Sequence, residues 1–402
     1  MDEQMGWIAF RSVRRLLNRY ICTTMDKILL FPYWLSLKIR HFLYDKGIKK
    51  VHQADVPTIC VGNVTVGGTG KTPHTEMLLR SMLADSDLGR KSIAVLSRGY
   101  KRKSKGFQQV TADGSAADYG DEPLQIKTKF PMVTVAVDSS RIRGCDFLAH
   151  PEKLQTEKSA RRCKDKNVNP ADLIILDDAY QHRKLKPTLS IVLIDFNRPT
   201  FKDHLLPFGR LRDLAERTQK ADILVITKCP YDLNSWQKCT WAENLGLRNF
   251  DAHKCCGIRP DGKIQYLFFT QITYDTPEAV FPEGDARYIY TKRLIMFSGI
   301  ANDTPMLKWL SGDYKIVRHF NFPDHHAFTR GDIASIASAS KAFPTAVIMT
   351  TEKDAQRIRD CRKIQDDMKQ RLFYLPIKTK FVTEEEEKIF ISVVKKSLQI
   401  IV

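Results

Sequence analysis

The sequence predicts an α/β fold in which a mainly parallel sheet carries helices on both faces and a second, smaller α/β lobe follows. Short β-branched, apolar runs alternate with helical patterns from Val56 to Lys228, an order typical of parallel sheets. A second alternating set begins near Arg293. Strands are expected over residues 57–62, 92–97, 132–137, 171–177, 190–195 and 221–227 in the first set, and over residues 293–298, 314–320, 345–350 and 371–376 in the second.

The chain is expected to fall into three parts, a usual number for its 402 residues. Residues 1–50 form an N-terminal amphipathic, membrane-associated region. Residues 51–228 form the first α/β domain, and residues 229–402 form a C-terminal α/β domain that closes over the active site. Within the last part, segment 229–292 has a poor pattern and is expected to be a connector.

A glycine-rich loop follows the first expected strand and precedes a helical pattern. It reads Thr65-Val66-Gly67-Gly68-Thr69-Gly70-Lys71-Thr72. Strand, glycine-rich loop and helix in this order are the setting of a phosphate-binding loop (P-loop) of nucleoside triphosphatases. The glycines let successive backbone N–H groups point at phosphate oxygens, and the helix N-terminus adds partial positive charge. Lys71 would reach the outer phosphates, and the Thr72 hydroxyl would bind Mg²⁺.

The loop departs from the strict P-loop pattern, which requires a glycine five residues before Gly70, where this chain has Thr65. The alternative is a glycine-rich turn between strand and helix that binds no ligand. The Gly-Lys-Thr ending and both flanking segments favour the P-loop.

An acidic pair, Asp177 and Asp178, ends the apolar strand expected over residues 171–177. In a P-loop protein a carboxylate at this place lies beside the loop and holds Mg²⁺ or its waters. Without the loop, an Asp-Asp turn after a core strand would be the better interpretation. Gln181 and His182 follow closely and could orient groups around the metal.

The composition indicates an anionic partner, because the formal net charge is +18 and the sequence pI is about 9.4. Nucleic acid, acidic lipid and a phosphorylated substrate all fit that charge. No aromatic-interleaved RNA-binding motif, zinc-finger spacing or long basic tail supports nucleic acid. The nine cysteines are scattered without a C-x-x-C pair, which favours a reduced cytosolic compartment.

Segment 27–50 has an apolar face, flanking basic residues and the aromatic pair Tyr33-Trp34. Its apolar run, residues 28–37, is too short to span a bilayer and contains Pro32. The pattern favours a helix lying in a membrane surface. The alternative is an N-terminal helix packed on the domain core.

Several further polar groups have weaker signals. Asp121 and Glu122 precede a helical pattern, where Asp121 is more simply an N-cap. Arg212 lies in the loop 206–213 and could stabilise charge on a transferring phosphoryl group. His325 follows Asp324 after a second-lobe strand and could take part in proton transfer, or belong to a polar turn. The segments Thr227-Lys228 and Thr351–Asp354 faintly resemble nucleotide-base motifs.

The order of these motifs resembles the tetraacyldisaccharide 4′-kinase family of lipid A synthesis. The matching stretches, between about Leu30 and Arg359, are GNVTVGGTGKTP, SRGYKR, GDEP, DDAYQHR, LPFGRLRD, ADILVITK, FPDHHAF and TTEKDA. The sequences of these motifs are most similar to those of members from Bacteroidetes-type bacteria. The resemblance implies an enzyme that uses ATP and Mg²⁺ to phosphorylate the 4′-hydroxyl of a tetraacyldisaccharide 1-phosphate, giving lipid IVA. It also implies a peripheral protein on the cytoplasmic face of the inner membrane, which we expect to be a monomer.

The resemblance also implies roles for individual residues. Thr65 to Thr72 and Gln181 would bind the nucleotide, and Thr72, Asp177 and Asp178 would hold the metal. Asp121 matches the residue viewed as the catalytic base, His325 its partner, and Lys71 and Arg212 the residues around the phosphoryl group. Asp213 stands where the family usually has glutamate, and residues 1–25 have no clear match.

A P-loop ATPase that acts as a nucleotide-dependent switch at a membrane surface is the alternative. Such proteins carry a lysine just before the paired glycines, where this chain has Val66. A switch also has no need of the GDEP and DHH stretches.

Overall fold

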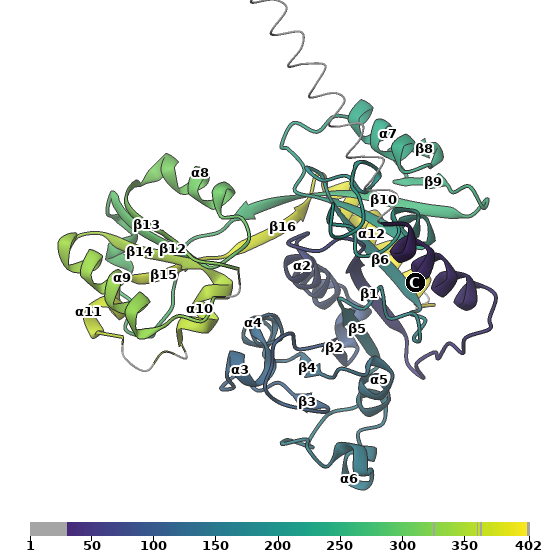
Figure 1. Cartoon of the computed structure of the whole chain (residues 1–402), viewed down its shortest axis with the longest axis horizontal. Helices are drawn as coiled ribbons and strands as arrows, with labels where there is room; N and C mark the ends of the chain where they lie inside the picture. Colours follow the sequence, from purple (N-terminus) through teal and green to yellow (C-terminus); the bar gives the residue numbers. More distant parts are fainter. Residues whose placement is uncertain (1–29, 325, 360, 362–363, 400–402) are drawn as a thin grey trace, which may run out of the picture.

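The computed structural model describes residues 30–324, 326–359, 361 and 364–399, which form two sheets with helices on both faces (Figure 1). The larger sheet has 11 strands. Ten follow the order β3-β4-β2-β5-β1-β6-β7-β10-β9-β8, and β16 pairs with β10. Their bounds are β1 Thr58–Asn63, β2 Ile93–Ser97, β3 Gln108–Gln109, β4 Thr134–Val137, β5 Leu173–Asp177, β6 Leu189–Asp195, β7 Ile223–Thr227, β8 Arg248–Asp251, β9 Cys256–Ile258, β10 Ile264–Tyr274 and β16 Ile377–Phe381.

The centre of the larger sheet is parallel, as predicted: all six pairings along the order β4-β2-β5-β1-β6-β7-β10 are parallel. The six strands expected in the first half of the chain are confirmed to within about two residues. Side chains of a strand alternate between two apolar layers, so Ile59 and Val61 lie in one layer and Cys60 in the other.

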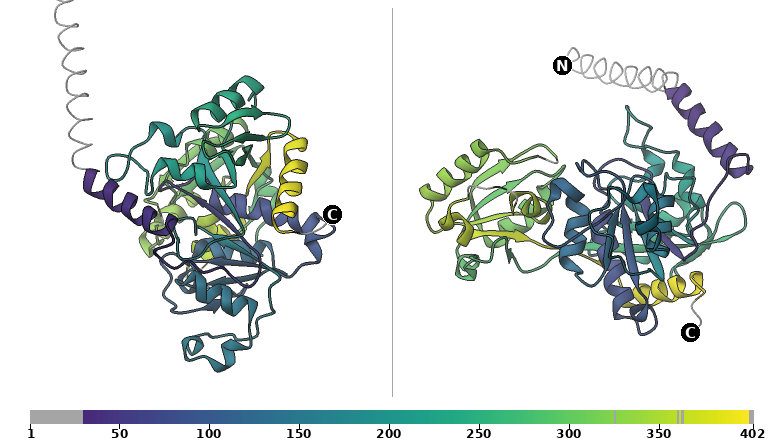
Figure 2. Two further views of the ribbon diagram at one scale, coloured as in Figure 1. Left: turned by 90° about the vertical axis from the view of Figure 1, so that its right-hand side faces the viewer. Right: turned by 90° about the horizontal axis from the view of Figure 1, so that it is seen from below.

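Helices cover both faces of the larger sheet, which confirms the predicted fold class. One layer contains α2 (Lys71–Ala84), α4 (Asp121–Lys129) and α12 (Glu384–Ser397). The other contains α5 (Arg141–Ala149), α7 (Ser235–Asn244) and the N-terminal helix, residues 30–45. Figure 2 shows the N-terminal helix and α12 on opposite sides of the molecule. The charged stretch 151–170 holds the short helix α6 (Lys153–Thr156).

The prediction of a connector over residues 229–292 is wrong, because this segment contains α7 and three strands of the larger sheet. The apolar run Leu267–Phe269 of β10 pairs with β7 and is fully buried, with side chains in both apolar layers. Since both faces of β10 are covered there, the alternation that marks a half-exposed strand is missing. The predicted boundary after residue 228 therefore does not coincide with the change of sheet.

The smaller sheet has five strands in the order β11-β15-β14-β12-β13. Its helices lie on both faces, with α9, α10 and α11 in one apolar layer and α8 in the other. The bounds are β11 Glu278–Ala279, β12 Arg293–Ser298, α8 Thr304–Asp313, β13 Lys315–Asn321, α9 Arg330–Ala342, β14 Val347–Thr351, α10 Glu352–Arg359, α11 Asp366–Arg371 and β15 Leu372–Leu375. The predicted second, smaller α/β lobe is thus confirmed.

A buried network of charges joins the two sheets. Glu76 on α2 is 0% exposed and accepts hydrogen bonds from Gln125 (2.7 Å) and Lys129 (2.7 Å), both on α4. Lys129 also forms an ion pair of 2.5 Å with Glu352, the first residue of α10 in the smaller lobe. One ammonium group is therefore shared by two carboxylates. Burial and the charge of Glu76 raise the pKa of Glu352 to about 7.

We expect the Glu352→Gln variant to gain stability relative to the wild type as the pH rises from about 5 to 7. The folded chain keeps the Glu352 proton up to about pH 7, whereas the unfolded chain releases it near the ordinary pKa of 4.5. Folding therefore loses free energy as the pH rises through this range, and glutamine cannot ionise. Melting temperatures of both proteins at several pH values test this, with Glu384→Gln, an exposed residue, as control. A difference that does not change with pH would contradict it.

Candidate active site

The glycine-rich loop connects the end of β1 to the start of α2, as the sequence predicts. Gly67 and Gly70 have φ of +92° and +86°, in the left-handed region that favours glycine. Gly70 is the N-cap of α2, and Lys71 and Thr72 are its first two residues. The Thr69 hydroxyl accepts a hydrogen bond of 2.6 Å from Asn63, which fixes the loop to the end of β1.

The loop 206–213 lies directly against the glycine-rich loop. Val66 donates its N–H to the carbonyl of Arg210 (2.7 Å), and Arg212 donates its N–H to the carbonyl of Val64 (2.9 Å). Thr65 forms a β-bridge with Leu211. These backbone contacts bring the Arg212 side chain to the phosphate loop.

The parallel pairing of β1 with β5 places Asp177 opposite Val61, next to the loop. The carboxylate of Asp177 is buried, and its Oδ2 accepts a hydrogen bond of 3.1 Å from Ser97 at the end of β2. Burial and the negative charges of Glu122 and Asp178 raise the pKa of Asp177 to about 7. The positive charges of Lys71 and Arg141 offset these effects only in part.

Two buried oxygens beside the loop fit a divalent cation. The Thr72 hydroxyl and Asp177 Oδ1 have no hydrogen-bond partner among the described residues. Leaving such groups unpaired costs about 1–3 kcal/mol each. Mg²⁺ prefers hard oxygen donors, such as hydroxyl and carboxylate groups. The predicted donor set of Thr72 and Asp177 is therefore chemically suited to this ion.

Asp178, the third predicted metal ligand, lies between two cations. Its carboxylate forms a two-armed ion pair with the Arg212 guanidinium, of which the longer arm is 3.2 Å. Lys71 Nζ lies 3.8 Å from Asp178 Oδ2. Burial alone would raise the pKa of Asp178, but Lys71 and Arg212 hold it below its usual value. Lys71, Arg212 and Asp178 are thus brought together.

Gln181 also lies at the loop, but its side chain bonds to the chain itself. Its Nε2 donates to the backbone carbonyl of Asn63. The backbone carbonyl of Gln181 accepts a hydrogen bond of 2.8 Å from Arg40 of the N-terminal helix. Asp213 is buried and bonded to His41 of the same helix at 2.6 Å. The N-terminal helix is therefore attached to the same loops that surround the phosphate loop.

Asp121 is the first residue of α4 and is not its N-cap, because that position is occupied by Gly120. Its carboxylate is held by the Arg357 guanidinium of α10, at 2.5 Å from Nη2 and 2.9 Å from Nε. His325 lies outside the described residues, so its predicted pairing with Asp121 stays a prediction. The neighbouring His326 pairs with Asp332 at 2.8 Å.

Sequence reasoning missed the contribution of α10. Lys353 forms an ion pair with Glu122, and Asp354 accepts hydrogen bonds from the Gly299 N–H (2.8 Å) and from Arg357 (2.7 Å). Lys353 and Arg357 are four residues apart, so they share one face of the helix. The TTEKDA stretch was the available signal, because Lys353 and Asp354 precede Arg357 by four and three residues, which is helical spacing.

Three more residues support the loop or the strand end beside it, and of these only Lys228 had a signal in the sequence, a faint resemblance to a nucleotide-base motif. Lys228 donates to the carbonyl of Gly68 (2.5 Å) and pairs with Asp195 (2.5 Å). His74 lies 2.7 Å from the carbonyl of Gly70 and 2.8 Å from the Thr270 hydroxyl, and burial lowers its pKa to about 4. Arg141 donates to the carbonyl of Asp177 at 2.9 Å. All three contact backbone or buried polar groups, which a sequence pattern does not reveal.

Comparison with known proteins agrees with this geometry. The family model described as "Tetraacyldisaccharide-1-P 4'-kinase" matches residues 27–398. The chain belongs to this family. It is 38% identical over 366 residues to the tetraacyldisaccharide 4′-kinase of Parabacteroides distasonis, covering 89% of this chain and 90% of that protein. It is 36% identical over 365 residues to that of Flavobacterium johnsoniae, covering 89% and 94%.

A solved structure shows that the similarity includes the fold. The protein in the crystal structure of the "apo" form of LpxK from Aquifex aeolicus in complex with ATP has 27% sequence identity to this chain. The two structures superpose with a TM-score of 0.62. The match covers 91% of this chain and 99% of that one. The resemblance stated from the motifs, including its similarity to Bacteroidetes sequences, is therefore confirmed. The chain is an ATP-dependent kinase of lipid A synthesis by family, and a nucleotide-dependent switch is not favoured.

Proposed function

We propose that this protein transfers the γ-phosphoryl group of ATP to the 4′-hydroxyl of a tetraacyldisaccharide 1-phosphate, giving lipid IVA. The proposal is carried by two buried oxygens beside the glycine-rich loop, those of Thr72 and Asp177, which have no hydrogen-bond partner in the described part of the chain. The chain belongs to the 4′-kinase family. The carboxylate of Asp121 is paired with Arg357, a residue of the smaller lobe.

Each residue then has a definite task. Backbone N–H groups of Gly67, Gly68 and Gly70 would cradle the phosphates, because those of Val66 and Thr69 are donated to backbone carbonyls. Lys71 would turn from Asp178 toward the outer phosphates. Thr72, Asp177 and Asp178 would hold Mg²⁺, which would supply positive charge for the oxygens of the transferable phosphoryl group of bound ATP. Arg212 stabilises negative charge that develops on the phosphoryl oxygens.

Asp121 accepts the proton of the sugar hydroxyl, with His325 as its partner. A lone carboxylate is a weak base at neutral pH, whereas a histidine, with an ordinary pKa of about 6.5, accepts protons readily. Arg357 holds the Asp121 carboxylate in one orientation. Gln181 supports the loop near the nucleotide through the Asn63 carbonyl.

Separation of radiolabelled lipid by thin-layer chromatography tests the function directly. The purified protein is incubated with [γ-³²P]ATP, Mg²⁺ and tetraacyldisaccharide 1-phosphate, and the label should move into a bisphosphorylated lipid. Label that stays in ATP, or is released as phosphate without lipid acceptor, would contradict the kinase assignment and support the ATPase switch.

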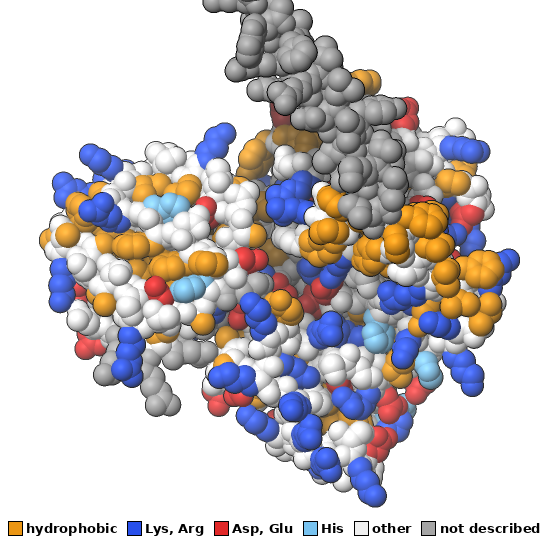
Figure 3. Space-filling view, viewed as in Figure 1, with side chains coloured by type: hydrophobic (Ala, Val, Ile, Leu, Met, Phe, Trp, Pro, Cys, Tyr) orange, Lys and Arg blue, Asp and Glu red, His pale blue; other side chains and the backbone are white. Residues whose placement is uncertain are grey.

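We also propose that the protein acts as a peripheral monomer on the cytoplasmic face of the inner membrane. The part of the chain described by the structure contains no helix long and apolar enough to cross a bilayer. The N-terminal helix buries Leu37, His41 and Tyr44. Its other side exposes large apolar side chains, among them Phe31, Trp34, Leu35, Ile39 and Phe42. Figure 3 shows hydrophobic side chains gathered there. Both sequence interpretations are thus compatible with one helix: one side packs on the core, and the other is free to enter a membrane surface.

Replacing Trp34, Leu35 and Phe42 with serine should release the protein from anionic vesicles without unfolding it. Each side chain is at least 38% exposed, so its loss removes contact with lipid more than contact with the core. We expect at least about tenfold weaker vesicle binding in co-sedimentation, from roughly 2 kcal/mol or more of lost apolar burial. The control replaces Trp236, Ile264 and Tyr290, which are exposed elsewhere. Equal effects of the two triple variants would contradict the proposal.

A further inference from the structure

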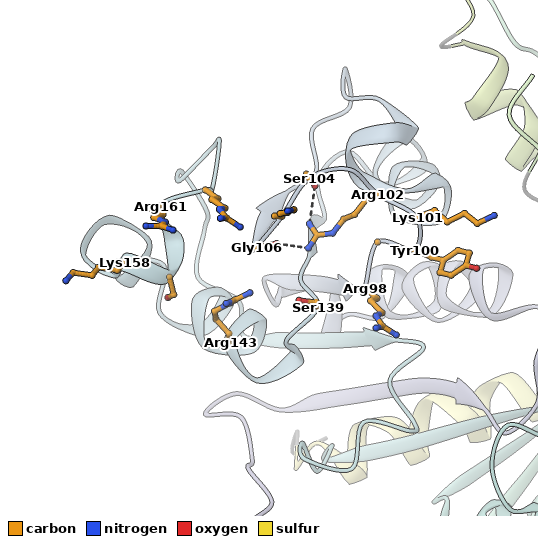
Figure 4. A pocket seen from close by; sticks show the side chains of 14 residues that line it. Arg98, Tyr100, Lys101, Arg102, Ser104, Gly106, Ser139, Arg143, Lys158 and Arg161 are labelled. Carbon is orange, nitrogen blue, oxygen red and sulfur yellow. Dashed lines mark hydrogen bonds between the residues drawn. The ribbon is translucent and has the colours of Figure 1, made fainter. Parts of the chain in front are cut away.

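A strongly basic cavity of about 860 Å³ opens near the candidate active site. It begins at Arg98, directly after Ser97, whose hydroxyl contacts Asp177. Figure 4 shows its walls, which come from residues 98–106, from Ser139 and Arg143 at the start of α5, and from residues 158–162. Eight of its 14 lining residues are Lys or Arg, and none is Asp or Glu.

The two main walls are fixed to each other by a buried side chain. Gln108, 2% exposed, donates from Nε2 to the carbonyls of Lys105 (2.9 Å) and Arg162 (2.5 Å). Its Oε1 accepts the N–H of Lys164 at 3.1 Å. These contacts hold the backbone on both sides of the cavity, so the basic side chains converge from a defined scaffold.

The loop 98–106 is closed by one of the lining arginines. Arg102 donates to the Ser104 hydroxyl (3.2 Å) and to the carbonyl of Gly106 (2.6 Å), as drawn in Figure 4. Gly99 has φ +68°, and a Cβ there would meet the Arg102 side chain at 2.4 Å. The turn therefore requires glycine and directs Arg102 along the cavity wall.

Much of the positive charge has no nearby counter-charge. Arg143 forms an ion pair with Asp138 (2.6 and 2.8 Å), whereas Arg98, Arg161 and Arg162 form none with the described residues. Burial lowers the pKa of Arg102, Asp138 partly offsets this, and Arg141 and Arg143 lower it further. An anion in the cavity would relieve the repulsion between these like charges.

We propose that this cavity is a second anion site, which binds a phosphate-bearing group distinct from the phosphates held by the glycine-rich loop. Guanidinium groups suit phosphate because they donate two parallel hydrogen bonds to its oxygens. Apart from Tyr100, the lining side chains are basic or hydroxyl-bearing, so the cavity suits a charged headgroup better than acyl chains.

The source we favour is the headgroup of an anionic phospholipid. In Figure 3, Lys and Arg side chains gather over the lower part of the view, where Figure 1 places β3, β4 and α6. The hydrophobic patch of the N-terminal helix is visible on the same face. A membrane surface could therefore meet both features at once. A soluble phosphate ion is the other source of the same chemistry.

The test uses the full-length protein with Arg161 and Arg162 replaced by glutamine. Both side chains are exposed and lie outside the residues assigned to phosphoryl transfer. The matched control replaces Arg90 and Arg248, two exposed arginines away from the cavity. The first measurement is co-sedimentation with phosphatidylcholine vesicles that contain phosphatidylglycerol. The second is the rise in melting temperature caused by inorganic phosphate, in which the glycine-rich loop contributes equally for every variant.

We expect the cavity variant to bind the anionic vesicles at least about tenfold more weakly than the control variant, because two phosphate contacts are lost. Unchanged vesicle binding with loss of the phosphate-induced stabilisation would assign the same site to a soluble phosphate. If both measurements are unchanged, or if both variants are affected equally, the proposal is overturned. Should the cavity variant melt early without ligand, Lys105→Gln with Lys158→Gln removes the same charge from the two walls. The outcome does not depend on kinase activity.

Discussion

The Lys71→Ala variant is expected to lose at least about 10²-fold in kcat, which corresponds to about 3 kcal/mol of transition-state stabilisation. In the structure Lys71 lies 3.8 Å from Asp178, beside Arg212, at the N-terminus of α2. It is therefore poised to contact outer phosphate oxygens, whose charge spreads during transfer. Thr72→Ala should have a similar effect, because it removes a buried hydroxyl that no described residue uses.

Steady-state kinetics of the lipid product decide this prediction. Lys91→Ala, which removes an exposed lysine away from the loop, is the matched control and should keep wild-type kcat. Melting temperatures of the variants separate a catalytic loss from unfolding. Near-normal turnover of Lys71→Ala or Thr72→Ala would contradict the assignment of this segment as a phosphate-binding loop.

Asp121→Asn is expected to lower kcat by about 10²–10⁴-fold while the KM for ATP changes little. Asparagine keeps an oxygen that accepts a hydrogen bond from Arg357, but it cannot take a proton from the sugar hydroxyl. Asp113→Asn, an exposed residue of the same lobe, is the control. Normal turnover with a lowered melting temperature would mean that Asp121 only joins the two lobes through Arg357.

The double variant with His325 tests whether the two residues act as a unit. Asp121→Ala and His325→Ala should each reduce kcat strongly, and the double variant should be hardly worse than the worse single one. Losses that multiply fully would show that the residues act independently.

The sequence was sufficient to predict the elements that have a local cause. The β-branched run before Asn63, the glycines at positive φ and the Gly-Lys-Thr ending each impose their own conformation, so β1, the loop and α2 could be predicted together. Asp177 could be placed because the carboxyl ends of parallel strands meet at one edge of a sheet.

The rest depends on contacts between distant parts of the chain. Asp121 resembled a helix cap, since nothing nearby in sequence shows that Arg357 reaches it from 236 residues away. The pattern of β10 was hidden because the strand is covered on both faces. The dual nature of the N-terminal helix was not foreseen either, because the His41–Asp213 pair joins residues 172 positions apart.

The pairing of β10 with β16 shows how the smaller lobe is inserted into the larger one. The two strands run antiparallel, with Tyr274 opposite Ile377, and the Asp275 N–H bonds to the carbonyl of Pro376 at 3.1 Å. The whole smaller lobe therefore occupies the position of a hairpin turn, as an insertion into an otherwise continuous β-ribbon. Since its entry and exit lie side by side, a short turn could replace residues 275–376 without moving either strand. The glycine-rich loop and the buried oxygens of Thr72 and Asp177 belong entirely to the host fold, whereas Arg357, the partner of Asp121, belongs to the insert.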